Sequence, residues 1–248
     1  MSADTLNELV PRPHQGRVFE QVARPGFADC APSGRIRLDA LARWLQDVAY
    51  GDVVDAGMAH TAVWVVRRTR IRVERFPRFG DTYALATFCS GLGRMWAERR
   101  TSISQLGEPD TAVEAVSLWV RLDPVDWHPI PFTEQEARLY GTSAAGRRVT
   151  ARLRHPPPPS LNGGVPWTFR ATELDIAGHI NNAAYWGPLE EELLGGPEPR
   201  LIDAELEYRS PCQPGGKILI RDEARRWIVS GEGETHASFL LAEIAPAI

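Results

Sequence analysis

The chain has 248 residues, a length that suits one large domain or two domains of modest size. Hydrophobic residues make up 43% of it and charged residues 24%, which is the composition of a folded globular protein and excludes a largely disordered chain. The net charge of -4 argues against a general affinity for nucleic acid or for anionic membrane surfaces. Any contact with an acidic partner must therefore depend on a local cluster of basic side chains.

Cysteine usage and hydropathy limit the compartment in which the protein can work. Cys30, Cys89 and Cys212 are far apart and form no C-x-x-C pair, which argues against a disulfide framework and a structural zinc site. The first fifteen residues lack the apolar core of a signal peptide, and no run of about 18 apolar residues occurs anywhere. We therefore expect a protein of the reducing cytoplasm without a membrane span.

The first half of the chain predicts one helix followed by four strands. Between residues 35 and 54, apolar side chains recur at helical spacing, and the pattern ends at Gly57. Four segments of strand type follow, punctuated by Gly, Asp and Pro. They cover residues 64–76, 82–91, 94–104 and 111–123.

The second half repeats this order, which indicates an internal duplication. Gly34-x-Ile36, which precedes the first expected helix, has a counterpart in Gly178-x-Ile180 before a second one. Four further segments of strand type cover residues 202–211, 217–224, 225–233 and 235–244. The shared order predicts two copies of one helix with an antiparallel sheet.

Two features of the expected second helix affect its shape and surface. Pro188 would remove one backbone hydrogen bond inside it, so we expect a kink or an early break near Gly187. The run Glu190, Glu191 and Glu192 is typical of a solvated helix end, although one of these carboxylates could reach inward.

A segment rich in small, basic and proline residues separates the two halves. It covers residues 141–165 and contains four consecutive prolines, Pro156–Pro159. Consecutive prolines favour an extended backbone without N–H donors, which suits a connector on the surface. The chain is therefore divided into a first unit at 14–140, a linker at 141–165 and a second unit at 166–248.

A motif at the head of the expected second helix gives the strongest functional signal. Residues 175–185 read D-x-x-G-H-I-N-N-x-x-Y. Four other segments accompany it in order: WVVRRTRIRVERFPRFGD (64–81), FCSGLGRMWAERRTSI (88–103), SLWVRLDP (117–124) and LEYRSPC (206–212). Over roughly residues 14–245 the chain resembles the acyl-[acyl carrier protein] thioesterases, as a divergent bacterial member.

The resemblance implies an α+β double hotdog fold, in which two copies of a long helix are wrapped by an antiparallel β-sheet and form a pseudo-dimer within one chain. The unit at 14–140 would be the N-terminal hotdog. The unit at 166–248 would be the C-terminal hotdog, which contains the motif.

Thioester hydrolysis needs a carboxylate or another base to activate water or to attack directly, and donors for the thioester oxygen. The resemblance implies that Asp175 is the catalytic carboxylate, His179 the catalytic histidine and the N–H of Asn182 an oxyanion donor. Asp175 would lie near the helix start, where backbone N–H groups are free. The alternatives are a helix cap for Asp175 and a structural histidine that holds the loop. We expect Asn181 to cap the helix.

Two positions depart from the plant-type enzymes of this family. Their catalytic aspartate and histidine are joined through an asparagine and a glutamate, and this chain has Ala177 and Pro211 at these positions. The D-x-A-G sequence resembles the wider acyl-CoA hotdog hydrolases, where one aspartate suffices. Cys212 occupies the cysteine position of the family, and we expect a small buried residue there.

The resemblance also implies where the substrate and its carrier bind. The acyl pocket would be lined by the first copy, with Tyr185 between the halves, although most of these residues are also expected in an ordinary core. The candidates are Leu41, Leu45, Val48, Trp64, Phe88 and Trp96. An acidic carrier protein would need a basic patch, for which the densest clusters are Arg147, Arg148, Arg152 and Arg154, then Arg67, Arg68, Arg70 and Arg72, each of which could instead be simply solvated.

The leading functional hypothesis is hydrolysis of a fatty acyl thioester on acyl carrier protein, within fatty acid metabolism. No cofactor or metal is expected, and the protein could be a monomer or a homodimer. One alternative is a non-hydrolytic acyl-binding or regulatory protein, since Ala177 and Pro211 interrupt the polar network. Another is an acyl-CoA thioesterase, and a hydratase has the least support.

Overall fold

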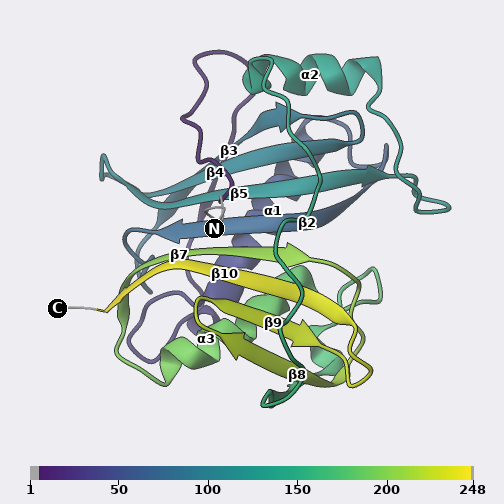
Figure 1. The fold of residues 1–248 in the computed structure, drawn as a ribbon. Helices are drawn as coiled ribbons and strands as arrows, with labels where there is room; N and C mark the ends of the chain where they lie inside the picture. Colours follow the sequence, from purple (N-terminus) through teal and green to yellow (C-terminus); the bar gives the residue numbers. More distant parts are fainter. Residues whose placement is uncertain (1–5, 247–248) are drawn as a thin grey trace.

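The computed structural model describes residues 6–246 and contains one continuous antiparallel sheet of ten strands (Figure 1). The first half contributes β1 (Phe19–Ala23), β2 (Val63–Val73), β3 (Tyr83–Leu92), β4 (Trp96–Gln105) and β5 (Thr111–Leu122). The second half contributes β6 (Val165–Phe169), β7 (Pro199–Tyr208), β8 (Gly215–Asp222), β9 (Arg225–Val229) and β10 (Thr235–Pro246). The strands that the sequence predicts are confirmed, whereas β1 and β6 were not foreseen.

The strand order confirms the internal duplication. Across the sheet it runs β1-β3-β4-β5-β2-β7-β10-β9-β8-β6, so the two halves follow the same order outward from the β2·β7 pair. These two central strands pair antiparallel, with Ile71 opposite Ala204. The two copies therefore share one hydrogen-bonded sheet, as the predicted double hotdog requires.

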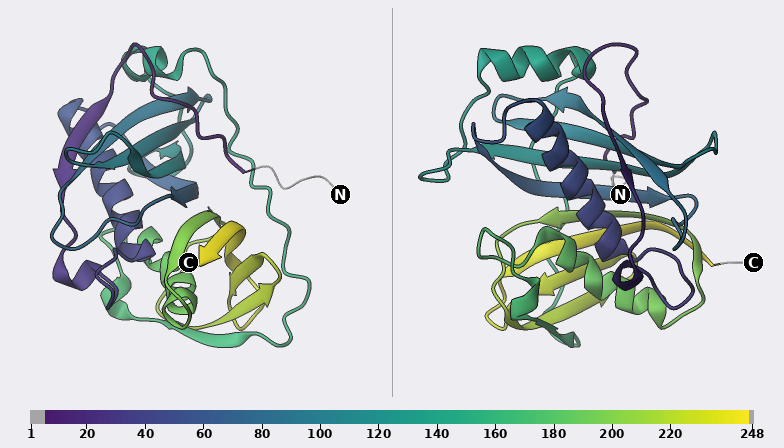
Figure 2. Two further views of the ribbon diagram at one scale, coloured as in Figure 1. Left: turned by 90° about the vertical axis from the view of Figure 1, so that its left-hand side faces the viewer. Right: turned by 180° about the vertical axis from the view of Figure 1, so that it is seen from behind.

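Helix α1 (Leu38–Asp55) crosses one face of the sheet, which we call the inner face (Figure 2, right). Its apolar residues recur at the predicted helical spacing and pack against Ile71, Ile202 and Leu206 of the central strands in one core. The helix ends at Asp55, and Gly57, just after the C-cap Ala56, has a φ of 69°, which favours glycine. The predicted first helix is thus confirmed.

The second helix differs from the expected long copy. A 3-10 helix, η3 (Asn182–Trp186), is followed by the eight-residue α-helix α3 (Gly187–Leu194). Pro188 lies in the first turn of α3, where its missing N–H needs no intrahelical acceptor. The predicted break near Gly187 is confirmed, and the prediction of a long helix in both copies is wrong for the second.

A buried ion pair joins the two halves and corrects the interpretation of Glu190 as a solvated residue. Arg35 and Glu190 are each 2% exposed, and their charged groups approach to 2.8 Å. The same carboxylate accepts the backbone N–H of Leu38 at 2.9 Å, which is the first residue of α1. Since Arg37 makes no side-chain cap, the second half supplies the cap of the first half's helix. Glu191, in contrast, is exposed.

The region between the halves begins with a helix that the sequence analysis did not predict. Helix α2 (Glu134–Ala144) lies across the expected boundary at residue 140. From there residues 145–164 run over the outer face of the sheet, opposite α1 (Figures 1 and 2, left). Backbone carbonyls of this segment accept the indole N–H groups of Trp96 at 2.8 Å and Trp227 at 2.9 Å, one from each half. The domain limits themselves stay a prediction.

None of the helices among residues 6–246 combines the length and the apolar composition needed to cross a membrane.

Removing the Glu190 carboxylate should destabilise the protein strongly. Glu190→Ala leaves the buried Arg35 guanidinium and the Leu38 N–H without their partner, and we expect a loss of about 3–5 kcal/mol in the free energy of unfolding. Denaturant unfolding followed by tryptophan fluorescence measures it. The matched control is Glu191→Ala, which should change stability by less than about 0.5 kcal/mol. Equal effects of the two substitutions would contradict the role given to Glu190.

Candidate active site

The motif at residues 175–185 begins with a tight loop between η2 (Ala171–Glu173) and η3. Asp175 accepts the backbone N–H of Ala177 on Oδ1 at 2.9 Å, and its own N–H donates to the carbonyl of His179 at 3.0 Å. Gly178 has a φ of 75°, a conformation that glycine adopts without strain. The loop therefore fixes the Asp175 carboxylate by local hydrogen bonds that its own sequence supplies.

Asn181 connects this carboxylate to the start of η3. Its side-chain oxygen accepts the Ala183 N–H at 2.8 Å, which confirms the predicted cap. Its amide nitrogen donates to Asp175 Oδ2 at 3.3 Å. Because Asn181 caps η3, the carboxylate of Asp175 is not used as the helix cap, which was the alternative reading.

The backbone of Asn182 provides a donor next to this carboxylate. The peptide that carries this N–H is held through the Asn181 carbonyl, which accepts the Ala184 N–H at 2.9 Å. The next carbonyl, that of Asn182, accepts the Tyr208 hydroxyl at 3.1 Å. Within residues 6–246, no acceptor for the Asn182 N–H is found. A fixed N–H without an acceptor is the kind of group that can stabilise an oxyanion.

His179 lies close in sequence but is less firmly held. Its side chain is partly exposed and lines a cavity. The described part of the chain offers its ring no hydrogen bond, and only its backbone carbonyl is engaged, by Asp175. Both ring nitrogens are thus free to contact a bound molecule or water.

Two cavities meet at Asp175. The larger has a volume of about 580 Å³ and lies between α1 and strands β3, β4 and β5, and the smaller has about 310 Å³ and extends toward the end of β7. The residues that line both are Val63, Trp64, Trp127, Asp175, Ala177 and Asn182. His179 and Tyr185 line only the smaller one. The carboxylate and the Asn182 backbone therefore lie at the junction of two compartments.

The residues predicted to line an acyl pocket are distributed unevenly. Trp64 lines both cavities, Tyr185 lines the smaller one and Leu45 borders a narrow gap beside them. Leu41 and Val48 are fully buried core residues of α1. Phe88 and Trp96 line neither cavity, and Trp96 binds the linker instead. Contact of any of them with substrate stays a prediction.

The positions that depart from the plant pattern face the smaller cavity. Ala177 and Pro211 both line it, and among its described lining residues Asp175 is the one carboxylate. Glu190, which could have replaced the missing glutamate, is engaged with Arg35. Cys212 is fully buried, as predicted, and burial raises the pKa of its thiol, which disfavours a reactive thiolate.

Several residues that line the larger cavity were not predicted from the sequence. Tyr140 reaches it from α2, and Arg99, Trp119 and Cys89 reach it from three neighbouring strands. A capping box at the start of α2, from Thr133 to Glu136, is the signal that would have predicted this helix. Burial raises the pKa of the Cys89 thiol to about 11, so this cysteine is protonated at neutral pH.

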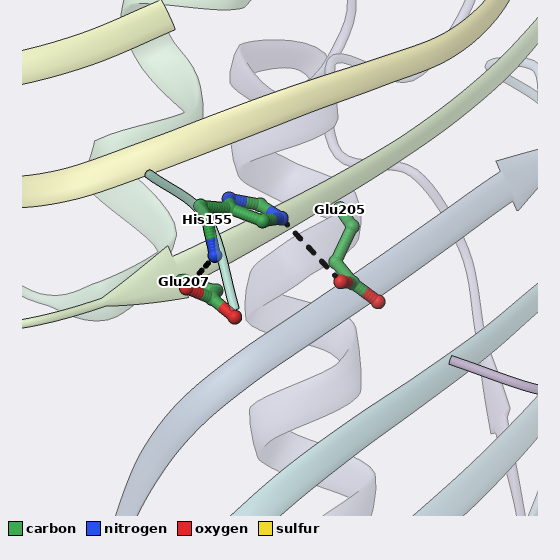
Figure 3. Close-up of side chains that lie close together, drawn as sticks. All are labelled: His155, Glu205 and Glu207. Carbon is green, nitrogen blue, oxygen red and sulfur yellow. Dashed lines mark hydrogen bonds and ion pairs between the residues drawn. The ribbon is translucent and has the colours of Figure 1, made fainter. Parts of the chain in front are cut away.

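A buried cluster on the outer face has the composition of a metal site (Figure 3). The ligand atoms of His155, Glu205 and Glu207 lie within 4.8 Å of one another, and His155 Nε2 is 3.5 Å from Glu205. Both oxygens of Glu207 accept backbone N–H groups of the linker, from Arg154 at 2.6 Å and His155 at 3.0 Å.

The arginines around this cluster supply the positive charge that a metal ion would otherwise provide. Arg68 and Arg209 approach Glu207, and Arg154 approaches Glu205. Since these positive charges already neutralise the carboxylates, the cluster fits a buried ion-pair network that fastens the linker to β7, and a divalent cation does not fit it. Arg68 is buried, so the interpretation of a solvated strand face is wrong for this residue. Arg148 and Arg152 of the linker are exposed.

In comparisons with known proteins, two family models match separate parts of the chain. The family described as "Acyl-ACP thioesterase N-terminal domain" matches residues 16–134, and "Acyl-ACP thioesterase C-terminal domain" matches residues 165–241. An uncharacterized protein of Mycobacterium tuberculosis is 27% identical over 239 residues, covering 94% of this chain and 95% of that protein. Oleoyl-acyl carrier protein thioesterase 1 of Arabidopsis thaliana chloroplasts is 27% identical over 168 residues, which cover 61% of this chain and 45% of the plant protein.

Solved structures share the fold at low sequence identity. The putative oleoyl thioesterase from Lactobacillus plantarum has a TM-score of 0.75 and 17% identity, covering 95% of this chain and 98% of its own. The 12:0-ACP thioesterase from Umbellularia californica has a TM-score of 0.73 and 17% identity, covering 94% and 99%. The predicted double hotdog fold is confirmed.

The network around Glu205 should make stability depend on acidic pH. Burial by itself raises the pKa of this carboxyl, but the close approach of His155, the hydrogen bond from the Asn7 N–H and the charges of Arg68 and Arg154 outweigh it and hold the pKa below its usual value. A depressed pKa stabilises the fold above the unfolded value of about 4.3, and this stabilisation is lost as the pH falls through the folded value.

Unfolding free energies measured between neutral and acidic pH should therefore fall less steeply below about pH 4.3 for Glu205→Gln than for the unaltered protein. The exposed Glu191→Gln should reproduce the unaltered profile. An unchanged acid slope in Glu205→Gln would refute the stabilising role of the ionised carboxylate.

Proposed function

Because the chain belongs to the acyl-[acyl carrier protein] thioesterase family, we propose that it hydrolyses a fatty acyl-[acyl carrier protein] to a free fatty acid and the carrier protein. The observation that supports this most directly is the Asp175 carboxylate at the junction of two cavities, beside a free backbone N–H. In this reaction water adds to the thioester carbonyl, the carbon–sulfur bond breaks, and the sulfur leaves as a thiol.

Asp175 is the group that starts the reaction. Its carboxylate either takes a proton from the attacking water or attacks the carbonyl directly, and hydrogen bonds from Ala177 and Asn181 fix its orientation for both routes. As the carbonyl oxygen gains negative charge, the N–H of Asn182 stabilises it, since the peptide of this N–H is held by the bond from Ala184 to the Asn181 carbonyl. His179 lines the smaller cavity and either orients the water or returns a proton to the leaving sulfur.

The two cavities suit the two ends of the substrate. The larger one is lined mostly by apolar side chains along α1 and takes the acyl chain. The smaller one, bordered by Arg67 and Arg209, takes the phosphopantetheine arm, whose phosphate is negatively charged. The exposed Arg148 and Arg152 are candidates for contact with the acidic carrier protein.

The absence of a second carboxylate favours a specific alternative. With Ala177 and Pro211 in place, Asp175 is the one carboxylate among the described residues of the smaller cavity. Such an incomplete polar network suits a non-hydrolytic acyl-binding or regulatory protein. An acyl-CoA thioesterase that works with a single aspartate is the other alternative. We place the reaction in the reducing cytoplasm, since Cys30, Cys89 and Cys212 are all free thiols.

Replacing the Asp175 carboxylate should abolish most turnover. Asp175→Asn keeps the shape of the side chain but removes its basicity, and we expect the hydrolysis rate of acyl-[acyl carrier protein] to fall at least ~10²-fold. The assay measures released fatty acid with a panel of carrier-protein and CoA thioesters of equal chain length. Glu191→Gln is the control and should retain full activity.

Equal turnover by Asp175→Asn would refute the assignment. Saturable acyl binding without product in the unaltered protein would establish the binding alternative, and faster turnover of CoA thioesters than of carrier-protein thioesters would establish the second alternative.

His179 should matter less than Asp175 because no described residue holds its ring. For His179→Ala we expect a decrease of about 10-fold to 10²-fold, whereas His179→Gln, which retains a hydrogen-bond donor and acceptor, should recover part of the rate if the ring orients water. The same assay measures both variants, with thermal unfolding as the folding control. Full activity of His179→Ala would remove this residue from the mechanism.

A further inference from the structure

We propose that the acyl chain bound in the larger cavity bears a neutral oxygen group, a hydroxyl or a ketone, in its part remote from the thioester, and that Tyr140 recognises this group. The inference rests on the proposed function, because it assigns the larger cavity to the acyl chain. Tyr140 lines this cavity, and its hydroxyl has no described partner.

Tyr140 is placed far from Asp175 within the cavity. Helix α2 packs on β3, where Tyr140, Cys89 and Ala144 form a small cluster of their own. Trp64 on β2 lies at the Asp175 end, and the sheet order β3-β4-β5-β2 puts three strand spacings, about 14 Å, between Cys89 and β2. An acyl chain that starts at Asp175 and fills the cavity therefore extends toward Tyr140.

The hydroxyl of Tyr140 has no hydrogen-bond partner within residues 6–246, although the side chain is only 5% exposed. The indole N–H of Trp119 also has no described partner, but β5 lies beside β2 and Trp119 lines a gap with Asn182, so this group belongs to the Asp175 end. Buried polar groups are nearly always paired, and a purely hydrocarbon chain would leave the Tyr140 hydroxyl without a partner. An oxygen on the acyl chain supplies what is missing.

The charges nearby select a neutral group. Arg99 approaches the Tyr140 ring with its guanidinium 5.9 Å from the ring centre and is paired with Asp52 at 2.7 Å. Asp52 and Asp55 also bind Arg17, so two carboxylates balance two guanidinium groups. Because no excess positive charge remains, a second carboxylate on the ligand would be buried without compensation.

The available hydrogen-bonding groups select an acceptor. The guanidinium of Arg99 only donates, whereas the Tyr140 hydroxyl both donates and accepts. A hydroxyl or ketone oxygen accepts from such donors. Tyr140 is thus proposed as a specificity-determining residue and takes no part in the chemistry at Asp175.

The test measures equilibrium binding of free fatty acids by calorimetry, so its readout does not depend on turnover. The panel consists of saturated fatty acids of equal chain length that bear no oxygen, a hydroxyl or ketone near the methyl end, or a hydroxyl beside the carboxylate. We expect about tenfold tighter binding of the acids with the remote oxygen, the scale of one net hydrogen bond, and loss of this preference in Tyr140→Phe. Tyr50→Phe is the matched control, since Tyr50 lines the same cavity but is 64% exposed and should retain the preference.

The outcomes separate this inference from the proposed function. Equal affinities across the panel, or a preference that persists in Tyr140→Phe, would overturn the role of Tyr140, and Asp175-dependent hydrolysis of plain acyl chains would then leave the proposed function intact. A Tyr140-dependent preference in a protein that hydrolyses none of the corresponding carrier-protein thioesters would support the inference and overturn the function.

Discussion

The buried pair of Arg35 and Glu190 is the constraint on which the arrangement of the two halves depends. Helix α1 lacks a side-chain cap of its own, and a carboxylate from α3 satisfies its first N–H group. Leaving either charge buried without the other would be strongly unfavourable, so α3 has to stay against the start of α1. Since η3 leads directly into α3, the same pair also limits where Asn182 and the neighbouring Asp175 can lie.

The sequence predicted what depends on local patterns. Three patterns can be recognised directly in the sequence: the helical spacing over α1, the alternation of the strands and the repeated order of elements. The break at Pro188 follows from its missing N–H. The burial of Glu190 could not be predicted, because three consecutive glutamates are alike in sequence and only the packing of α3 on α1 distinguishes them. Tyr140 was missed for a related reason, since its contact with the cavity depends on how α2 docks on β3.

The two departures from the plant-type pattern change the balance of polar groups in the cavities. Around Asp175 the smaller cavity has no titratable side chain at Ala177 or Pro211, so the proposed chemistry there depends on one carboxylate, on His179 and on backbone donors. The remote end of the larger cavity instead holds Tyr140 and Arg99. The proposed recognition by Tyr140 therefore lies away from the proposed reacting bond, where it would affect selectivity without affecting the reaction itself.

Because β2 pairs with β7, the two copies that are visible in the sequence are not independent structural units. Either half alone would expose the unpaired backbone of a long central strand, and such an exposed edge promotes aggregation with other chains. Separating the halves would also leave the first N–H group of α1 without the Glu190 carboxylate. If the linker stayed with the first half, Glu207 would lose the backbone N–H groups that it accepts. Each half therefore supplies backbone partners, a helix cap or charges that the other needs, so the two copies depend on each other in the folded structure.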